Sequence, residues 1–234
     1  MDPVIRAIAE AQQRFATLLQ RAITQAPLTV VQYQRYLSMQ YHLTRGVQGY
    51  FLRAAAHPAL ARRRALRRFL FDFAAEEEHH YLVAAADLER MGLPLLPEPL
   101  DVTLWHAHFR AVVDDWPYLR LGAACVLENL AGGTARDATR AALAAPFLTR
   151  ENTRFVVLHL HEAQPHGEQI VAALAASSPD DSEIDDLATG ARQATVLYLR
   201  MMEWALFPGS LAASLDAMPP SSPTDARLVP GLAT

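Results

Sequence analysis

Long stretches of the chain contain neither proline nor glycine, as in residues 4–26 and 59–91, and short segments with these residues separate them. The long stretches are dominated by Ala, Leu, Arg, Glu and Gln, and the 234 residues include only 10 glycines. These residue types favour helices, and runs of β-branched residues are short. The pattern therefore predicts an all-α bundle of about seven helices.

Proline, glycine and capping residues set the expected boundaries of these helices. The helical segments are predicted at about 3–24, 29–55, 58–91, 102–114, 117–131, 134–145, 150–176 and 181–206. Residues 1–207 are expected to form one helical domain, and the Pro/Ser-rich residues 208–234 a C-terminal tail.

The composition excludes several classes of function. The chain contains no Lys, which excludes Schiff-base chemistry and a phosphate-loop lysine. Its single cysteine, Cys125, excludes an internal disulfide and a cysteine-based zinc site. A net charge of −4 gives no general attraction to nucleic acid or anionic membranes. With neither a signal-like N-terminus nor a membrane-spanning apolar run, a cytoplasmic protein is expected.

Acidic and histidine residues interrupt the apolar face of the segment 58–91. That face is defined by apolar residues at steps of three and four, namely Leu66, Leu70, Phe73, Ala84, Leu88 and Met91. Glu77 and His80 continue the series in its middle, so this pair is predicted to point inward. Glu76 and His79 fall on a neighbouring polar strip and are predicted to face water. If the inward-facing residues bind a metal, replacing Glu76 or His79 should leave that binding nearly intact.

Two further segments carry polar groups on their inward faces. In 150–176, His159 and His166 lie seven residues apart and therefore share one face, with Glu162 and Ala163 flanking the line between them. Pro165 is expected to kink this helix. In 117–131, Glu128 extends an inward row that begins with Leu121 and Cys125.

Buried carboxylates and imidazoles are costly unless they are paired or bound to a metal. A lone inward histidine is most often a satisfied core residue, and Glu77 could form a salt bridge with an arginine of a neighbouring helix. The whole set on three facing helices is better explained by metal ligation. Carboxylate and histidine on facing helices hold iron or manganese in helical bundles.

Three segments resemble the haem-oxygenase-like superfamily, which has the TenA/PqqC-like fold, and in particular its diiron oxidases. EEEHHYLVAAADLERMG resembles the Glu-x-x-His segment, LGAACVLENLAGG the glutamate-bearing helix, and FVVLHLHEAQPHGEQ the F-x3-H-x3-D-x2-H helix. They occur in the family's order. By position, the resemblance implies the metal ligands Glu77, His80, Glu128, His159 and His166.

One position departs from the family pattern. The aspartate expected between the two late histidines is Ala163, so one metal position has lost a carboxylate. Glu162, one residue earlier, is the candidate replacement ligand. The prediction is an asymmetric site that holds one metal tightly and a second weakly or not at all.

The resemblance implies a non-haem iron oxidase or oxygenase that uses one or two irons, with manganese as an alternative. O2 would be the co-substrate for oxidation of a small organic molecule, and a homodimer is compatible with this prediction. The alternatives are a metal-poor or non-catalytic member that binds a ligand or partner, and a TenA-like hydrolase with Cys125 as nucleophile. Haem is disfavoured because no histidine precedes His42.

Overall fold

The structure is a computed structural model that describes residues 1–24, 26–161 and 166–210, apart from the side chains of His159 and His161. Within these ranges it contains helices and no strand, which confirms the predicted all-α class. The elements in chain order are α1 (Asp2–Ile23), α2 (Val30–Thr44), α3 (Gln48–Ala56), η1 (Pro58–Leu60), α4 (Arg64–Glu77), α5 (His80–Arg90), α6 (Leu100–Val112), α7 (Pro117–Asn129), η2 (Gly133–Ala135), α8 (Arg136–Ala142), α9 (Arg154–His161), α10 (His166–Ala176) and α11 (Asp181–Leu206).

Several predicted helices are divided into shorter ones. The predicted helix 29–55 forms α2 and α3, and Gly46 between them has a φ of 83°, a left-handed conformation that favours glycine. The predicted helix 58–91 is interrupted between Glu77 and His80, where no proline or glycine lies. Helix irregularities without a breaker residue often accompany functional sites. The segment with Pro165 and most of the predicted tail lie outside the described residues.

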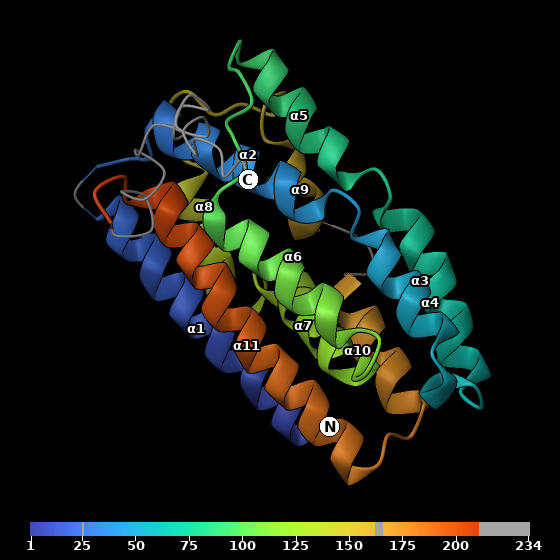
Figure 1. Cartoon of the computed structure of the whole chain (residues 1–234). Helices are drawn as coiled ribbons and strands as arrows, with labels where there is room; N and C mark the ends of the chain where they lie inside the picture. Colours follow the sequence, from blue (N-terminus) through green and yellow to red (C-terminus); the bar gives the residue numbers. More distant parts are fainter. Residues whose placement is uncertain (25, 162–165, 211–234) are drawn as a thin grey trace, which may run out of the picture.

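Helix α7 lies at the centre of the bundle. It is buried on most sides, and it packs against α11, α10, α1, α3 and α6. Helices α1 and α11 run side by side along one edge of the molecule, whereas α3 and α4 pair on the other side of α6, α7 and α10 (Figure 1). A helix that is apolar nearly all round needs neighbours on every side, and its position in the bundle satisfies this requirement.

Two glycines allow α7 and α11 to touch backbone to backbone. A Cβ atom added at Gly122 of α7 would lie 1.9 Å from the carbonyl oxygen of Leu187. A Cβ added at Gly190 of α11 would lie 1.8 Å from the carbonyl oxygen of Leu119. Each helix therefore presents a glycine to a carbonyl of the other, and the pair packs more closely than side chains would permit.

A second apolar cluster joins α2, α5 and α9, and it includes Leu37, Leu88 and Phe155. The buried carboxylate of Asp87 in α5 accepts a hydrogen bond of 2.9 Å from the backbone N–H of Phe155, in the first turn of α9. A carboxylate satisfies the free N–H groups that begin a helix. Asp87 thus fixes the start of the helix that carries His159.

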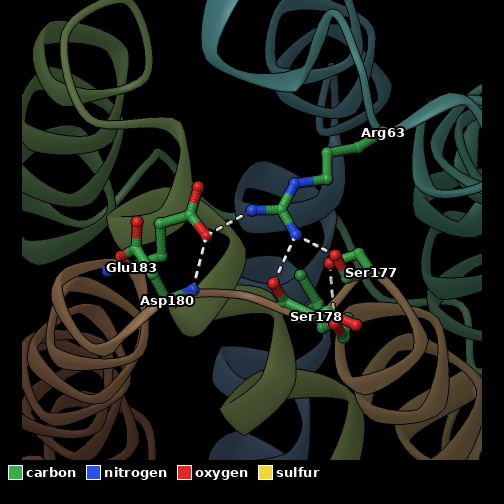
Figure 2. Close-up of polar contacts among 6 residues, drawn as sticks. Arg63, Ser177, Ser178, Asp180 and Glu183 are labelled. Carbon is green, nitrogen blue, oxygen red and sulfur yellow. Dashed lines mark hydrogen bonds and ion pairs between the residues drawn. The ribbon is translucent and has the colours of Figure 1, made fainter.

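Arg63 joins the beginning of α4 to the corner between α10 and α11 (Figure 2). Its guanidinium donates hydrogen bonds to the carbonyl oxygens of Ser177 and Ser178, which follow the end of α10. It also lies 2.8 Å from Oε2 of Glu183, in the first turn of α11. An arginine at the C-terminal end of a helix satisfies its last carbonyl groups and complements its dipole. Arg63 therefore holds α4 and α10 in a fixed relative position.

No helix in the described part of the chain combines the length and the apolar character needed to cross a lipid bilayer.

Candidate metal centre

Three donor residues from three helices converge at one point. Glu77 is the last residue of α4, Glu128 lies one residue before the end of α7, and His166 is the first residue of α10. One ligand atom of each lies within 4.8 Å of those of the other two. Two ligands on opposite sides of one ion are about 4.2 Å apart, given metal–ligand distances of about 2.1 Å. Small adjustments would therefore bring all three onto a single ion.

The carboxylate of Glu77 lies between two histidine rings. Its Oε2 is 2.7 Å from Nδ1 of His80, and its Oε1 is 2.8 Å from Nδ1 of His166. The two rings are nearly parallel, with an interplanar angle of 12° and centroids 5.7 Å apart. Nδ1 of His166 also lies 3.9 Å from Oε2 of Glu128. Glu77 thus links His80 to the three-residue group.

Burial and charge leave Glu77 ionised. Its side chain is buried, and burial by itself raises the pKa of the carboxyl group. Hydrogen bonds and charge interactions with His166 and His80 outweigh burial and lower the pKa of Glu77 to about 2. A carboxylate that stays ionised at neutral pH inside a helical bundle is suited to bind a cation.

A glycine allows α10 to approach α7 at the centre. A Cβ atom added at Gly167 would lie 2.4 Å from Cγ and Oδ1 of Asn129. Asn129 is held by a 2.8 Å hydrogen bond from its Nδ2 to the carbonyl oxygen of Cys125. Gly167 follows His166 and Asn129 follows Glu128, so this close contact brings the two donor residues together.

The predicted phase of the Glu/His run is confirmed. Glu77 and His80 are buried, whereas Glu76 and His79 are exposed. Glu76 nevertheless differs from the expectation, because its Oε2 lies 3.3 Å from Nε2 of His166. The ring of His166 therefore faces Glu77 and Glu128 with Nδ1, and Glu76 with Nε2.

Two of the predicted ligands cannot be placed in this group. His159 belongs to α9, but its side chain lies outside the described residues. Glu162, with Ala163 beside it, also lies outside the described residues. The assignments of Glu77, His80, Glu128 and His166 as metal ligands stay predictions, and the structure shows that these four residues lie close together.

The donor set fits a first-row transition metal. Carboxylate oxygens and imidazole nitrogens suit iron, manganese and zinc. Oε1 of Glu77 is buried and lies 2.8 Å from Nδ1 of His166. A buried, charged oxygen beside an imidazole nitrogen is suited to coordinate a cation.

An apolar cavity adjoins the centre. Glu77 and Glu128 line it together with apolar residues such as Leu43, Trp105, Leu127 and Val156. A second, almost wholly apolar cavity shares Phe15, Tyr36, Thr139 and Val156 with the first. The two cavities therefore adjoin and extend from the carboxylates towards α1, α2 and α11.

Cys125 is poorly placed to act as the nucleophile of a TenA-like hydrolase. The thiol is fully buried, and burial raises its pKa to about 12. A nucleophilic cysteine needs both solvent access and a depressed pKa. Cys125 also does not line either cavity described above.

No family model matches the chain, and no curated protein is significantly similar to it. A solved domain of unknown function from Shewanella denitrificans, described as having a haem oxygenase-like fold, superposes with a TM-score of 0.74. The two chains share 18% identity over 86% of this chain and 89% of that one.

The fold is haem-oxygenase-like. The fold agrees with the fold that the resemblance of the three sequence segments implies. At 18% identity the similarity establishes the arrangement of helices and not an activity. Within this haem-oxygenase-like fold, the group around Glu77 is the candidate functional site.

Proposed function

We propose that this protein is a non-haem iron-dependent oxidase or oxygenase that oxidises a small organic substrate with O2. The observation that carries the proposal is the convergence of Glu77, Glu128 and His166 from three helices within 4.8 Å, beside an apolar cavity. Manganese satisfies the same donor types and is the alternative metal. The fold alone does not imply this activity, because one fold can support several kinds of chemistry.

The residues of the chain have distinct roles in this proposal. Glu77, Glu128 and His166 would hold the metal, with His80 against the second oxygen of Glu77. When bound with an open coordination position, such a metal supplies O2 activation. The apolar walls bind the apolar part of the substrate and exclude water from the reacting atoms. Gln40, which donates a 2.7 Å hydrogen bond to Tyr198, presents a polar group in the same cavity.

The first experiment measures metal binding. Protein loaded with Fe(II) without oxygen and then desalted should retain about one or two irons per chain. His79→Ala is the matched control for His80→Ala, because the two residues are adjacent but only His80 is buried. His80→Ala should lose iron and His79→Ala should keep it. If the wild-type protein retains no metal, the proposal is wrong.

The second experiment tests the chemistry. Anaerobic Fe(II)-loaded protein is mixed with O2, with and without candidate amino acids, amines and fatty acids. An oxygen-dependent absorption change and loss of one substrate are expected. Ala163→Asp restores the carboxylate of the family pattern and should strengthen binding of a second metal, because ligand charge and number set affinity.

A non-catalytic ligand-binding protein is the second candidate, and the nearly all-apolar second cavity favours it. This function predicts tight binding of an apolar molecule by metal-free protein. It also predicts no oxygen-dependent substrate loss after iron loading. The two experiments above therefore separate the two candidates.

A further inference from the structure

A buried cation lies on the same helix as Glu128 of the candidate metal centre. Arg120 in α7 is the one arginine with a buried side chain among the described residues, with 1% of its surface exposed. Its Nε and Nη1 are buried and form no hydrogen bond within the described part of the chain. Charged groups are seldom buried unless they are paired, so this position needs an explanation.

Aromatic rings surround the guanidinium of Arg120. Its central carbon lies 4.7 Å from the ring centroid of Tyr50, 5.3 Å from that of Phe51 and 5.6 Å from that of Phe109. Cation–π contacts of this kind stabilise a desolvated guanidinium without fixing its hydrogen bonds. They hold a positive charge in the core, but they do not neutralise it.

A row of aromatic contacts connects this charge to the donor residues. Phe51 contacts Phe73 edge-on with centroids 4.9 Å apart, and Phe73 contacts the ring of His166 in the same way at 4.9 Å. Along α7, Arg120 and Leu127 are seven residues apart and share one side of the helix. Leu127 lines the cavity that Glu77 and Glu128 also line.

Two carboxylates of the candidate centre, Glu128 and Glu77, are among the groups that act on Arg120. Burial lowers the pKa of Arg120 to about 10, and Tyr50, Glu128, Cys125 and Glu77, in decreasing order, raise it. Burial raises the pKa of Tyr50, and it raises that of Cys125 to about 12, so both are neutral near pH 7. Glu128 and Glu77 remain as the negative charges, and Arg120 is still protonated.

We propose that Arg120 is the fixed counter-charge of the metal centre. In the metal-free protein its charge offsets those of Glu77 and Glu128. Towards a bound metal the same charge is repulsive, and the repulsion grows with the charge of the ion. Arg120 therefore lowers the affinity of the centre for the metal and favours the divalent over the trivalent state of the bound ion. This inference rests on the proposed function, since it requires a metal at the centre.

The test compares variants that separate charge from packing. Arg120→Met removes the charge and keeps an unbranched apolar side chain, whereas Arg120→Lys keeps the charge. Mn2+ is titrated into metal-free wild type and both variants at neutral pH. Arg120→Met should bind Mn2+ at least about tenfold more tightly, given the expected size of such a charge interaction. Arg120→Lys should remain close to the wild type. The reduction potential of bound iron should fall in Arg120→Met.

The fold is checked by helical circular dichroism and thermal unfolding. Replacing a buried charge by an apolar residue is often neutral or stabilising, so Arg120→Met should fold. If Arg120→Met does not fold, the neutral and polar variant Arg120→Gln is used in its place.

Equal Mn2+ affinity in the wild type and in the neutral variant would overturn the counter-charge role alone. Equal tightening in Arg120→Met and Arg120→Lys would also overturn it, since packing would then be the cause. A wild type that binds neither Mn2+ nor Fe2+ would overturn the proposed function, and the counter-charge role with it.

Discussion

The two sides of α7 differ in how they pack. Towards α11, the backbones touch at Gly122 and Gly190. Towards α4 and α10, helix ends meet around Glu128, and a cavity lies beside the carboxylates. The first side therefore fixes the bundle, and the second provides polar groups and room for a ligand. Because stability and chemistry are assigned to different sides of one helix, mutations should affect them separately.

The largest effect is expected on the α11 side. Gly122→Ala places a Cβ against the backbone of Leu187, which cannot move without displacing α11. The loss of unfolding free energy should be on the order of 3 kcal/mol or more. Gly49→Ala is the matched control, because nothing lies within 4 Å of the added Cβ in α3. It should be neutral or stabilise by up to about 1 kcal/mol. Chemical denaturation measures both, and similar stabilities would contradict the tight contact.

The next effect is expected on the polar side. Glu77→Gln keeps the shape of the side chain and removes its charge. Metal affinity should fall by more than about 100-fold, since even outer partners of metal ligands contribute about 10–100-fold. Helix content should be unchanged. Competition with a chelator measures the affinity, and a Glu77→Gln variant that binds metal as the wild type does would remove Glu77 from the centre.

A smaller effect is expected at the contact that sets the spacing of α7 and α10. Gly167→Ala pushes against the side chain of Asn129, which can move more easily than a backbone. Metal affinity should fall by about tenfold, because the effect is on the position of His166 and not on a ligand itself. Asn129→Ala in the same chain should relieve the clash and recover part of the affinity. No recovery in the double variant would mean that Gly167 acts in another way.

The smallest of these effects is expected at Glu76. Its Oε2 lies 3.3 Å from Nε2 of His166, so it can accept that N–H and leave Nδ1 directed at Glu77. Metal-binding histidines commonly donate their other N–H to a carboxylate. Glu76→Gln should weaken metal binding by about tenfold or less, since the carboxylate is exposed and screened. His79 is exposed without this contact to His166, so His79→Ala should have no effect. If Glu76→Gln and His79→Ala bind metal with equal affinity, Glu76 has only the solvent-facing role predicted from the sequence.

Periodicity predicted much of this arrangement. The helical class follows from composition and breakers, and the burial of Glu77 and His80 follows from the spacing of Leu66, Leu70 and Phe73. The interruption between Glu77 and His80 could not be predicted, because no glycine or proline marks it.

Other parts of the centre depend on three-dimensional contacts that no sequence pattern reports. Glu76 lies near His166 because the end of α4 lies next to the beginning of α10. The close approach at Gly167 needs Asn129 on another helix. Arg120 precedes Leu121 of the predicted inward row, but successive residues of a helix point about 100° apart, so no sequence pattern marked its burial.

The meeting of helix ends at Glu77, Glu128 and His166 has a consequence for how the protein folds. These residues come from remote parts of the chain, and long-range contacts of this kind form late and slowly. The donor group does not exist in the unfolded chain, so an ion bound there would stabilise the native state in proportion to the logarithm of its concentration. Availability of the ion would thereby regulate how much of the protein survives thermal unfolding and proteolysis.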